Sequence, residues 1–260
     1  MKLRNFCIVL LLAAGFSVRA AHAADDISVA AAADLQFVLP EVAAQFEKAS
    51  GEHVRLTFGS SGNFFAQIQN GAPFDVFFSA DVDYPRKLEA AGMAEPGSLY
   101  EYATGRLVLW APAQSKLDLN GGLKVLLDPA VKRIAIANPE HAPYGRAAEA
   151  AMKHAGVYDA VAAKLVLGEN ISQTATFVSS GSADIGLLAL SLAVAPAMKE
   201  KGRFVEVPPD DYPPIRQAAM VVKSAKNKAG AQGFMDFVKS PAVKELMQKY
   251  GFKVSEAAGK

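Results

Sequence analysis

Short apolar runs alternate along the chain with longer segments in which apolar residues recur every three or four positions. Residues 27–33, 75–79 and 183–190 are runs of the first kind, with the length and composition of buried strands. The segment after Asp34 is of the second kind and predicts a helix, which Asp34 would cap and Pro40 would distort in its first turn. Strands that alternate with helices through short turns indicate βαβ units and a mostly parallel sheet.

The remaining predicted elements follow the same two patterns. Further strands are predicted at residues 53–58, 106–111, 133–137, 164–167, 204–207 and 215–222. Further helices are predicted at residues 84–91, 123–127, 146–154, 173–179, 229–239 and 241–250, with a short one after the turn at 59–62. Two sets of strands and helices with a late return of the chain predict an α/β fold of two lobes. The first lobe would comprise residues 24–108 and the second residues 109–211, and residues 212–260 would return to the first.

Four strand-to-helix turns are the candidate binding elements of the sequence. They are residues 33–35, 59–62, 142–145 and 170–172, two in each predicted lobe. In open α/β sheets, ligands bind beyond the carboxyl ends of the strands, where the first helical amides lack partners and the helix dipole is positive. These turns offer amides, hydroxyls and a phenol but no Lys or Arg. They therefore suit a small ionised oxyanion held by neutral donors between the lobes.

The first 23 residues have the pattern of a secretory signal peptide. A basic start precedes a short apolar stretch, and residues 21–23 (Ala-His-Ala) form a cleavage site, so the mature protein is expected to begin near Ala24. Cleavage removes the only cysteine, Cys7, and three of the 27 Lys and Arg residues, which leaves 24 basic against 26 acidic residues. A nearly neutral, cysteine-free chain predicts a soluble periplasmic protein without disulfides and gives no indication of nucleic-acid or membrane-surface binding.

Three stretches of the sequence are similar to a known family. GSSGNFFAQIQNGAPFDVFFSAD begins at Gly59, NPEHAPYG at Asn138 and YGF at Tyr250. Together they resemble the periplasmic molybdate-binding proteins of ABC importers, and the resemblance extends over essentially all of the mature chain. It implies the type II periplasmic-binding-protein fold, in which two α/β lobes joined by hinge strands close on molybdate or tungstate. It also implies a monomer without cofactor or enzymatic activity, with an inner-membrane permease and its ATPase as partners.

The resemblance also implies which residues bind the oxyanion. Ser61 matches a ligand that uses its hydroxyl and its amide, Tyr144 one that uses its amide or its phenol, and Ile171 one that uses its amide. Ser60, next to Ser61, is a weaker candidate. These residues would meet molybdenum only through the oxygens of molybdate, with no separate metal centre. Other members take a phenol from the position that is Ala189 here, so this chain resembles the subgroup with the tyrosine at Tyr144.

The first turn departs from the family pattern, which the resemblance implies to be Ser or a Thr-Asn pair. This chain has Ala33 and Asp34 there. A buried, unpaired carboxylate beside a dianion is costly. In one interpretation, Asp34 caps its own helix by accepting from the amide of Gln36 or Phe37, and its backbone N–H contacts the ligand. In the other, Asp34 accepts a proton-bearing ligand oxygen, which favours phosphate or arsenate over molybdate or sulfate.

A periplasmic serine hydrolase is the alternative from another functional class. Ser60 or Ser61 would be the nucleophile, with Ser61 preferred, and His141 would be the base, but the turn lacks the G-x-S-x-G pattern of a nucleophile elbow. The mature chain has no Cys and no His-x-x-x-His pair, so the sequence does not favour a protein-bound metal. Trp110, the only tryptophan, is expected to pack near the hinge.

Overall fold

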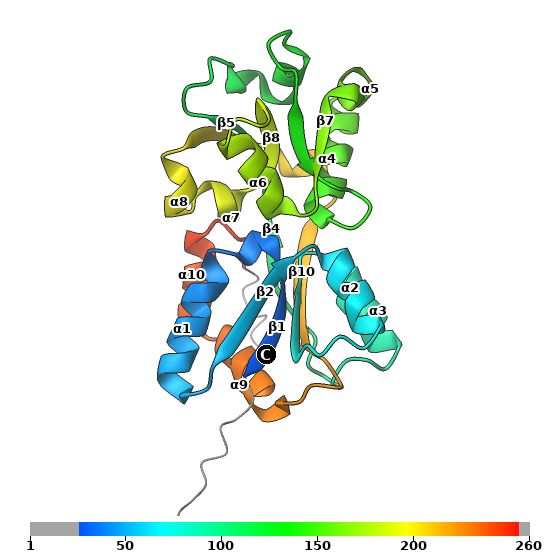
Figure 1. The fold of residues 1–260 in the computed structure, drawn as a ribbon, viewed down its shortest axis with the longest axis vertical. Helices are drawn as coiled ribbons and strands as arrows, with labels where there is room; N and C mark the ends of the chain where they lie inside the picture. Colours follow the sequence, from blue (N-terminus) through cyan, green and yellow to red (C-terminus); the bar gives the residue numbers. More distant parts are fainter. Residues whose placement is uncertain (1–25, 255–260) are drawn as a thin grey trace, which may run out of the picture.

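The chain forms two lobes, each built on a five-stranded sheet (Figure 1), in a computed structural model that describes residues 26–254. The first sheet contains β1 (Ile27–Ala32), β2 (Val54–Gly59), β3 (Val76–Ser79), β4 (Tyr100–Gly105) and β10 (Ile215–Val221). The second contains β5 (Leu107–Pro112), β6 (Ile134–Ala137), β7 (Leu165–Gly168), β8 (Ile185–Ala189) and β9 (Gly202–Glu206). The strand order is β2-β1-β3-β10-β4 in the first lobe and β7-β6-β8-β5-β9 in the second.

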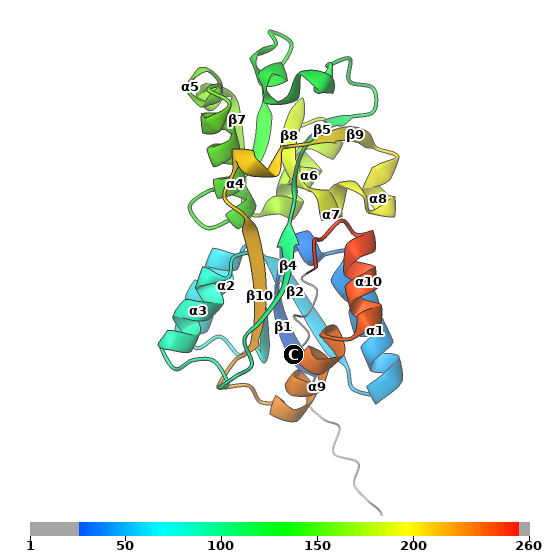
Figure 2. The ribbon, with the colours of Figure 1, turned by 180° about the vertical axis from the view of Figure 1, so that it is seen from behind.

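Helices cover both faces of the first sheet (Figures 1 and 2). On one face lie α1 (Val38–Ser50), α9 (Lys228–Val238) and α10 (Pro241–Lys249), and on the other α2 (Ser61–Gln69) and α3 (Asp83–Ala90). Consecutive side chains of β3 show this division, because residues of a strand alternate between its faces. The ring of Phe78 lies 6.1 Å from that of Phe234 in α9, whereas Phe77 packs in the apolar cluster of Phe64 and Leu88. The first lobe therefore buries apolar side chains on both faces of its sheet.

Two longer and three four-residue helices cover the described part of the second lobe. They are α4 (Pro143–His154), α5 (Tyr158–Val161), α6 (Ile171–Ser179), α7 (Leu190–Ala193) and α8 (Pro196–Lys199), and α4 and α6 both pack on β6. The 3₁₀ helices are η1 (Ala33–Leu35), η2 (Leu119–Leu127), η3 (Ala162–Lys164) and η4 (Pro209–Asp211). Trp110 in β5 is fully buried and lies against Gly202 of β9, where a Cβ atom would come 2.0 Å from the indole. Only glycine fits at that position of β9.

Two crossings join the lobes. The chain passes from β4 to β5 through Arg106 and returns from β9 to β10 through η4 (Figure 2). β10 is antiparallel to β3 and β4, and β5 is antiparallel to β8 and β9, whereas β1 and β6 are parallel to their neighbours. Each sheet is therefore mixed and less parallel than the alternation of strands and helices predicted, because the crossing segments enter as antiparallel strands. The second sheet begins at Leu107, just before the lobe boundary predicted after residue 108.

The predicted strands lie within two residues of observed ones, but several other elements differ, and the short helices α5, α7 and α8 were not predicted. β4 was not predicted, because its sequence YEYATG has no apolar run although half of its residues are buried. α4 begins at Pro143, three residues before the predicted start, since proline is favoured in the first turn of a helix. α1 begins only at Val38, after the 3₁₀ helix η1, which contains Asp34.

The predicted signal peptide lies outside the described residues. Its cleavage site and Cys7 belong to the same stretch. Within residues 26–254, no helix combines the length and the apolar composition that a bilayer span requires.

Candidate functional site

The four predicted turns meet in one small cavity between the lobes. The first two follow β1 and β2, and the other two follow β6 and β7. The structure brings together all six residues predicted for binding, which line this cavity with six neighbours. They are Ala33, Asp34, Ser60, Ser61, Tyr144 and Ile171. The volume open to the centre of a water molecule is only about 10 Å³, so the lobes are closed around the space of about one water.

Three helices, α2, α4 and α6, begin at this cavity. Within the described residues, the backbone N–H groups of Ser61, Tyr144 and Ile171 donate to no protein acceptor. By contrast, the Asn170 side chain occupies the two amides that follow Ile171, at 3.0 Å each. Free amides in the first turn of a helix carry partial positive charge and bind anions. The three helices thus supply a neutral donor set from both lobes.

Among the described residues that line the cavity, Asp34 has the only carboxyl group. The other lining residues include no Lys, Arg or His. Burial and the neighbouring Asp34 raise the pKa of the Tyr144 phenol well above its usual value, so its hydroxyl stays a donor. In residues 26–254, no group of His, Cys, Asp and Glu side chains is arranged to hold a metal ion. The site therefore offers neutral donors and one carboxyl.

The two serines of the second turn have different partners. Ser61 Oγ accepts a hydrogen bond from the Ala80 amide at 2.9 Å, which leaves its proton free to donate to a ligand. Ser60 caps α2 by accepting from the Asn63 amide at 3.4 Å, and its Oγ lies 3.0 Å from Nδ1 of His141. Among the described contacts, His141 thus meets Ser60, which already caps α2, and not Ser61, so only one of the two serines considered for a hydrolase lies beside the candidate base.

Asp34 does not cap a helix, so the cap in the first interpretation of this residue was wrong. It lies inside η1, and its Oδ2 accepts from Gln217 Nε2 at 2.7 Å and from the Tyr144 hydroxyl at 3.1 Å. Oδ1 has no hydrogen-bond partner in the described part of the chain, and the residue is only 1% exposed. Burial raises the pKa of Asp34 to about 7, an effect that the hydrogen bonds from Gln217 and Tyr144 and the backbone amide of Asp34 itself offset only in part.

Gln217 and Tyr102 complete the network around Asp34, and neither was identified from the sequence. The Tyr102 hydroxyl donates to Gln217 Oε1 at 2.7 Å, which orients the Nε2 end of Gln217 toward Asp34. Gly105 leaves room for this network, because a Cβ atom there would lie 2.2 Å from the Tyr144 hydroxyl and 2.7 Å from Gln217 Nε2. Gln217 comes from β10 and Tyr102 from β4, so both crossing strands contribute to the floor of the site.

Hydrogen bonds between the lobes surround the cavity. The Gly62 amide at the start of α2 donates to the His141 carbonyl at 2.9 Å. On another side, the Ser172 hydroxyl in α6 donates to Gln36 Oε1 at 2.5 Å. Each bond joins a turn of the first lobe to a turn of the second, so these contacts belong to the closed arrangement of the lobes.

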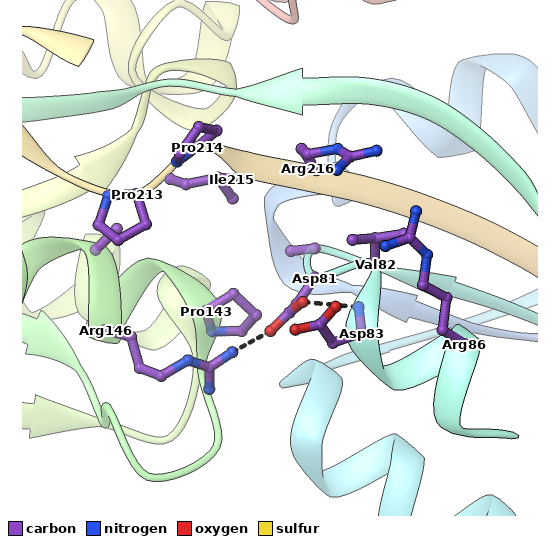
Figure 3. Close-up of a pocket in the computed structure, with 12 residues that line it drawn as sticks. Asp81, Val82, Asp83, Arg86, Pro143, Arg146, Pro213, Pro214, Ile215 and Arg216 are labelled. Carbon is purple, nitrogen blue, oxygen red and sulfur yellow. Dashed lines mark hydrogen bonds and ion pairs between the residues drawn. The ribbon is translucent and has the colours of Figure 1, made fainter. Parts of the chain in front are cut away.

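A larger cavity of about 360 Å³ lies beside this site, between the turn after β3 and the start of α4 (Figure 3). Asp81 and Arg146 meet across it at 2.5 Å, from the first and the second lobe. Arg86 and Arg216 both pair with Glu101, at 2.8 and 2.6 Å. Because its arginines are already paired, this cavity is a poor anion site, and its ion pair of Asp81 and Arg146 instead joins the lobes.

Two lobes that close on a small donor-lined cavity define a solute-binding protein. The chain belongs to the bacterial extracellular solute-binding protein family, whose sequence model matches residues 27–253. The molybdate-binding protein ModA of Azotobacter vinelandii is 41% identical over 245 residues, which cover 94% of this chain and 96% of the relative. ModA of Rhodobacter capsulatus is 39% identical over 250 residues, 96% of each chain.

The solved structures agree with these sequence relationships. The periplasmic molybdate-binding protein of Azotobacter vinelandii superimposes with a TM-score of 0.84 at 38% identity, covering 89% of this chain and all of that one. The comparison confirms the predicted two-lobe periplasmic-binding-protein fold. Membership of the family also confirms that the chain is a solute-binding protein and not an enzyme.

Proposed function

We propose that this protein captures a tetrahedral oxyanion, molybdate or tungstate, between its lobes and delivers it to an ABC importer. The observation that carries the proposal is the set of three free helix amides, from both lobes, around one cavity without a cationic side chain. The relatives named as molybdate-binding proteins support this choice of ligand. The contacts are assigned to the amides of Ser61, Tyr144 and Ile171 and to the Ser61 hydroxyl, with Ala33 and Ser60 beside the ligand.

Binding requires the lobes to open and close. Turns of both lobes line the cavity and meet beside it through the hydrogen bond from the Gly62 amide to the His141 carbonyl, so the lobes part to admit an oxyanion and close again around it. The ligand then bridges amides of both lobes and shifts the population toward a closed form. In this proposal the protein is a monomer, exported to the periplasm by its signal peptide. An inner-membrane permease recognises the closed form, and its ATPase supplies the energy.

A protonated oxyanion such as phosphate or arsenate is the second candidate ligand. Asp34, which lines the cavity, favours this candidate, because its Oδ1 accepts no hydrogen bond within the described chain. An ionised Asp34 accepts from a proton-bearing ligand oxygen and repels a fully ionised ligand. The two candidates therefore differ in which oxyanions stabilise the protein.

A thermal-shift panel with molybdate, tungstate, sulfate, phosphate and arsenate tests the proposed function. A ligand at about a thousand times its Kd adds roughly 4 kcal/mol to the free energy of unfolding, which for a chain of this size raises Tm by on the order of 10 °C. We expect such a rise with molybdate and tungstate alone. A rise with phosphate or arsenate alone would favour the second candidate, and no rise with any of the five would contradict oxyanion binding.

Ser61→Ala is expected to raise the Kd for molybdate by roughly 10- to 100-fold, because a hydrogen bond to a charged group contributes about 1.5–3 kcal/mol. Tyr144→Phe is expected to weaken binding as well, since Asp34 then loses its donor at 3.1 Å. Isothermal titration calorimetry measures both effects. Ser182→Ala, at an exposed serine of the second lobe, is the matched control and should bind as the wild type does. An unchanged Kd in Ser61→Ala would exclude that hydroxyl from the site.

A further inference from the structure

One carboxylate oxygen in the binding cavity has no hydrogen-bond partner within residues 26–254. Asp34 is 1% exposed, and both hydrogen bonds to its carboxylate, from Gln217 and Tyr144, go to Oδ2. Oδ1 makes no hydrogen bond to any described residue, although Asp34 lines the same cavity as Ser61 and Ile171. Buried polar atoms are almost always paired, so an unpaired oxygen at a ligand cavity indicates an atom that the ligand completes.

In the part of the chain that the structure describes, no Lys, Arg or His is in contact with this carboxyl. Among the described residues, its side chain meets the amide of Gln217 in β10 and the phenol of Tyr144 in α4, and Tyr102 in β4 reaches it only through Gln217. The two helices packed against η1, α6 and α7, carry no titratable side chain, and β2 carries only Arg55, which is exposed. A dianion that enters this site would add two negative charges beside an uncompensated carboxylate.

We propose that Asp34 binds the oxyanion as a neutral carboxylic acid whose Oδ1 donates its O–H to a ligand oxygen, so that one proton enters the closed site with each ligand. The inference rests on the proposed function. Oδ2 keeps its two donors, and the proton comes from solvent, so no covalent bond of the ligand changes. A carboxyl held neutral in an apolar site is a good hydrogen-bond donor at neutral pH.

Closure of the lobes is the step that favours the protonated carboxyl. Two of its neighbours come from the second lobe, since the Tyr144 hydroxyl donates to Oδ2 and the Ser191 hydroxyl donates to the Asp34 carbonyl at 2.7 Å. The burial that raises the pKa of Asp34 to about 7 is therefore completed when the lobes meet. Below its pKa in the free protein, the acid already carries the proton that the complex needs. Above it, each further pH unit lowers the fraction of binding-competent protein about tenfold.

Calorimetry of molybdate binding between pH 7.5 and 9 tests the proposal, because molybdate stays a dianion throughout. We expect the Kd of the wild type to rise about tenfold per pH unit. In buffers with different heats of ionisation, the observed enthalpy should report the uptake of about one proton per ligand. Asp34→Asn keeps an acceptor oxygen for Gln217 and Tyr144 and offers a permanent donor in place of Oδ1. This variant is expected to bind with a flat pH profile and without proton uptake.

The possible results separate this proposal from the proposed function. A wild type that binds molybdate without proton uptake and with a flat profile would overturn the role of Asp34 alone. Proton uptake that persists in Asp34→Asn, or tight binding of phosphate with no binding of molybdate, would overturn it as well. Absence of oxyanion binding by both proteins from pH 5.5 to 9 would instead overturn the proposed function. If Asp34→Asn does not fold, the proton count of the wild type decides the question.

Discussion

Gly62→Ala is expected to weaken molybdate binding about a hundredfold while the free protein stays folded. A Cβ atom on Gly62 would lie 2.7 Å from the His141 carbonyl oxygen and 2.9 Å from the His141 Cα, and these are backbone atoms of the other lobe that cannot rotate away. The change also disturbs the 2.9 Å hydrogen bond from the Gly62 amide to that carbonyl. Overpacking costs about 1–3 kcal/mol and a lost hydrogen bond about 1 kcal/mol. Since the ligand is held only by the closed form, this cost appears in the Kd.

The same substitution leaves the first lobe undisturbed. The three atoms nearest to the added methyl group all belong to His141, so the methyl meets no close neighbour when the lobes are apart. Within a helix, alanine is more stable than glycine by about 0.5–1 kcal/mol, so Tm of the free protein should be unchanged or slightly higher. Asn63→Ala, at the exposed next residue of α2, is the control and should bind normally. At a ligand concentration that saturates the wild type but lies below the raised Kd of the Gly62 variant, small-angle scattering should show that only this variant keeps the radius of gyration of the free protein. A compact Gly62 variant with wild-type affinity would show that these two turns do not meet in the bound form.

The binding turns could be predicted because their signals are local. A strand end, a Ser/Gly or Pro-containing turn and the first residues of a helix lie within a few positions of one another. The turn at residues 59–62 and the helix after it are observed where the pattern predicts them. The same local rule could have placed the start of α4 at Pro143, since proline in the first helical turn was visible in the sequence.

The network around Asp34 could not be predicted, because its members are far apart in the chain. Gln217 is 183 residues from Asp34 and 115 from Tyr102. The available signal was one polar residue inside the buried strand IRQAAMV, where a fully buried Gln must find partners. The prediction that Asp34 caps a helix was wrong for the same reason. A local pattern cannot show that an amide and a phenol from distant strands and helices bind the carboxylate.

Asp75→Asn is expected to lower the free energy of unfolding by about 3 kcal/mol and Tm by about 10 °C. Asp75 is 3% exposed and precedes β3. Its Oδ2 accepts from the Ser28 amide at 2.8 Å, and its Oδ1 accepts from the amides of Lys226 and Asn227 at 2.6 and 3.3 Å. The carboxylate thus joins β1 by hydrogen bonds to the segment that leads into α9. An Asn side chain has one acceptor oxygen, so its NH₂ group must face at least one of these backbone N–H groups. That N–H group then loses its charge-assisted hydrogen bond to the carboxylate.

The position of Asp75 separates this loss from binding. It lies at the amino end of β3, whereas Ser79 and the Ala80 amide that holds Ser61 follow the carboxyl end. At temperatures below the transition, Asp75→Asn should therefore bind molybdate with the Kd of the wild type, although it melts earlier in calorimetry and in urea. Asp210→Asn, at an exposed aspartate in the return crossing, is the control and should change stability by less than about 0.5 kcal/mol. Weakened binding in a folded Asp75 variant would show that the two ends of this sheet are coupled. If binding is unchanged, the hydrogen bonds of Asp75 at the amino end of β3 contribute to stability, whereas the turns where the lobes meet determine affinity. Gly62→Ala would then lower affinity without loss of stability, and Asp75→Asn would lower stability without loss of affinity.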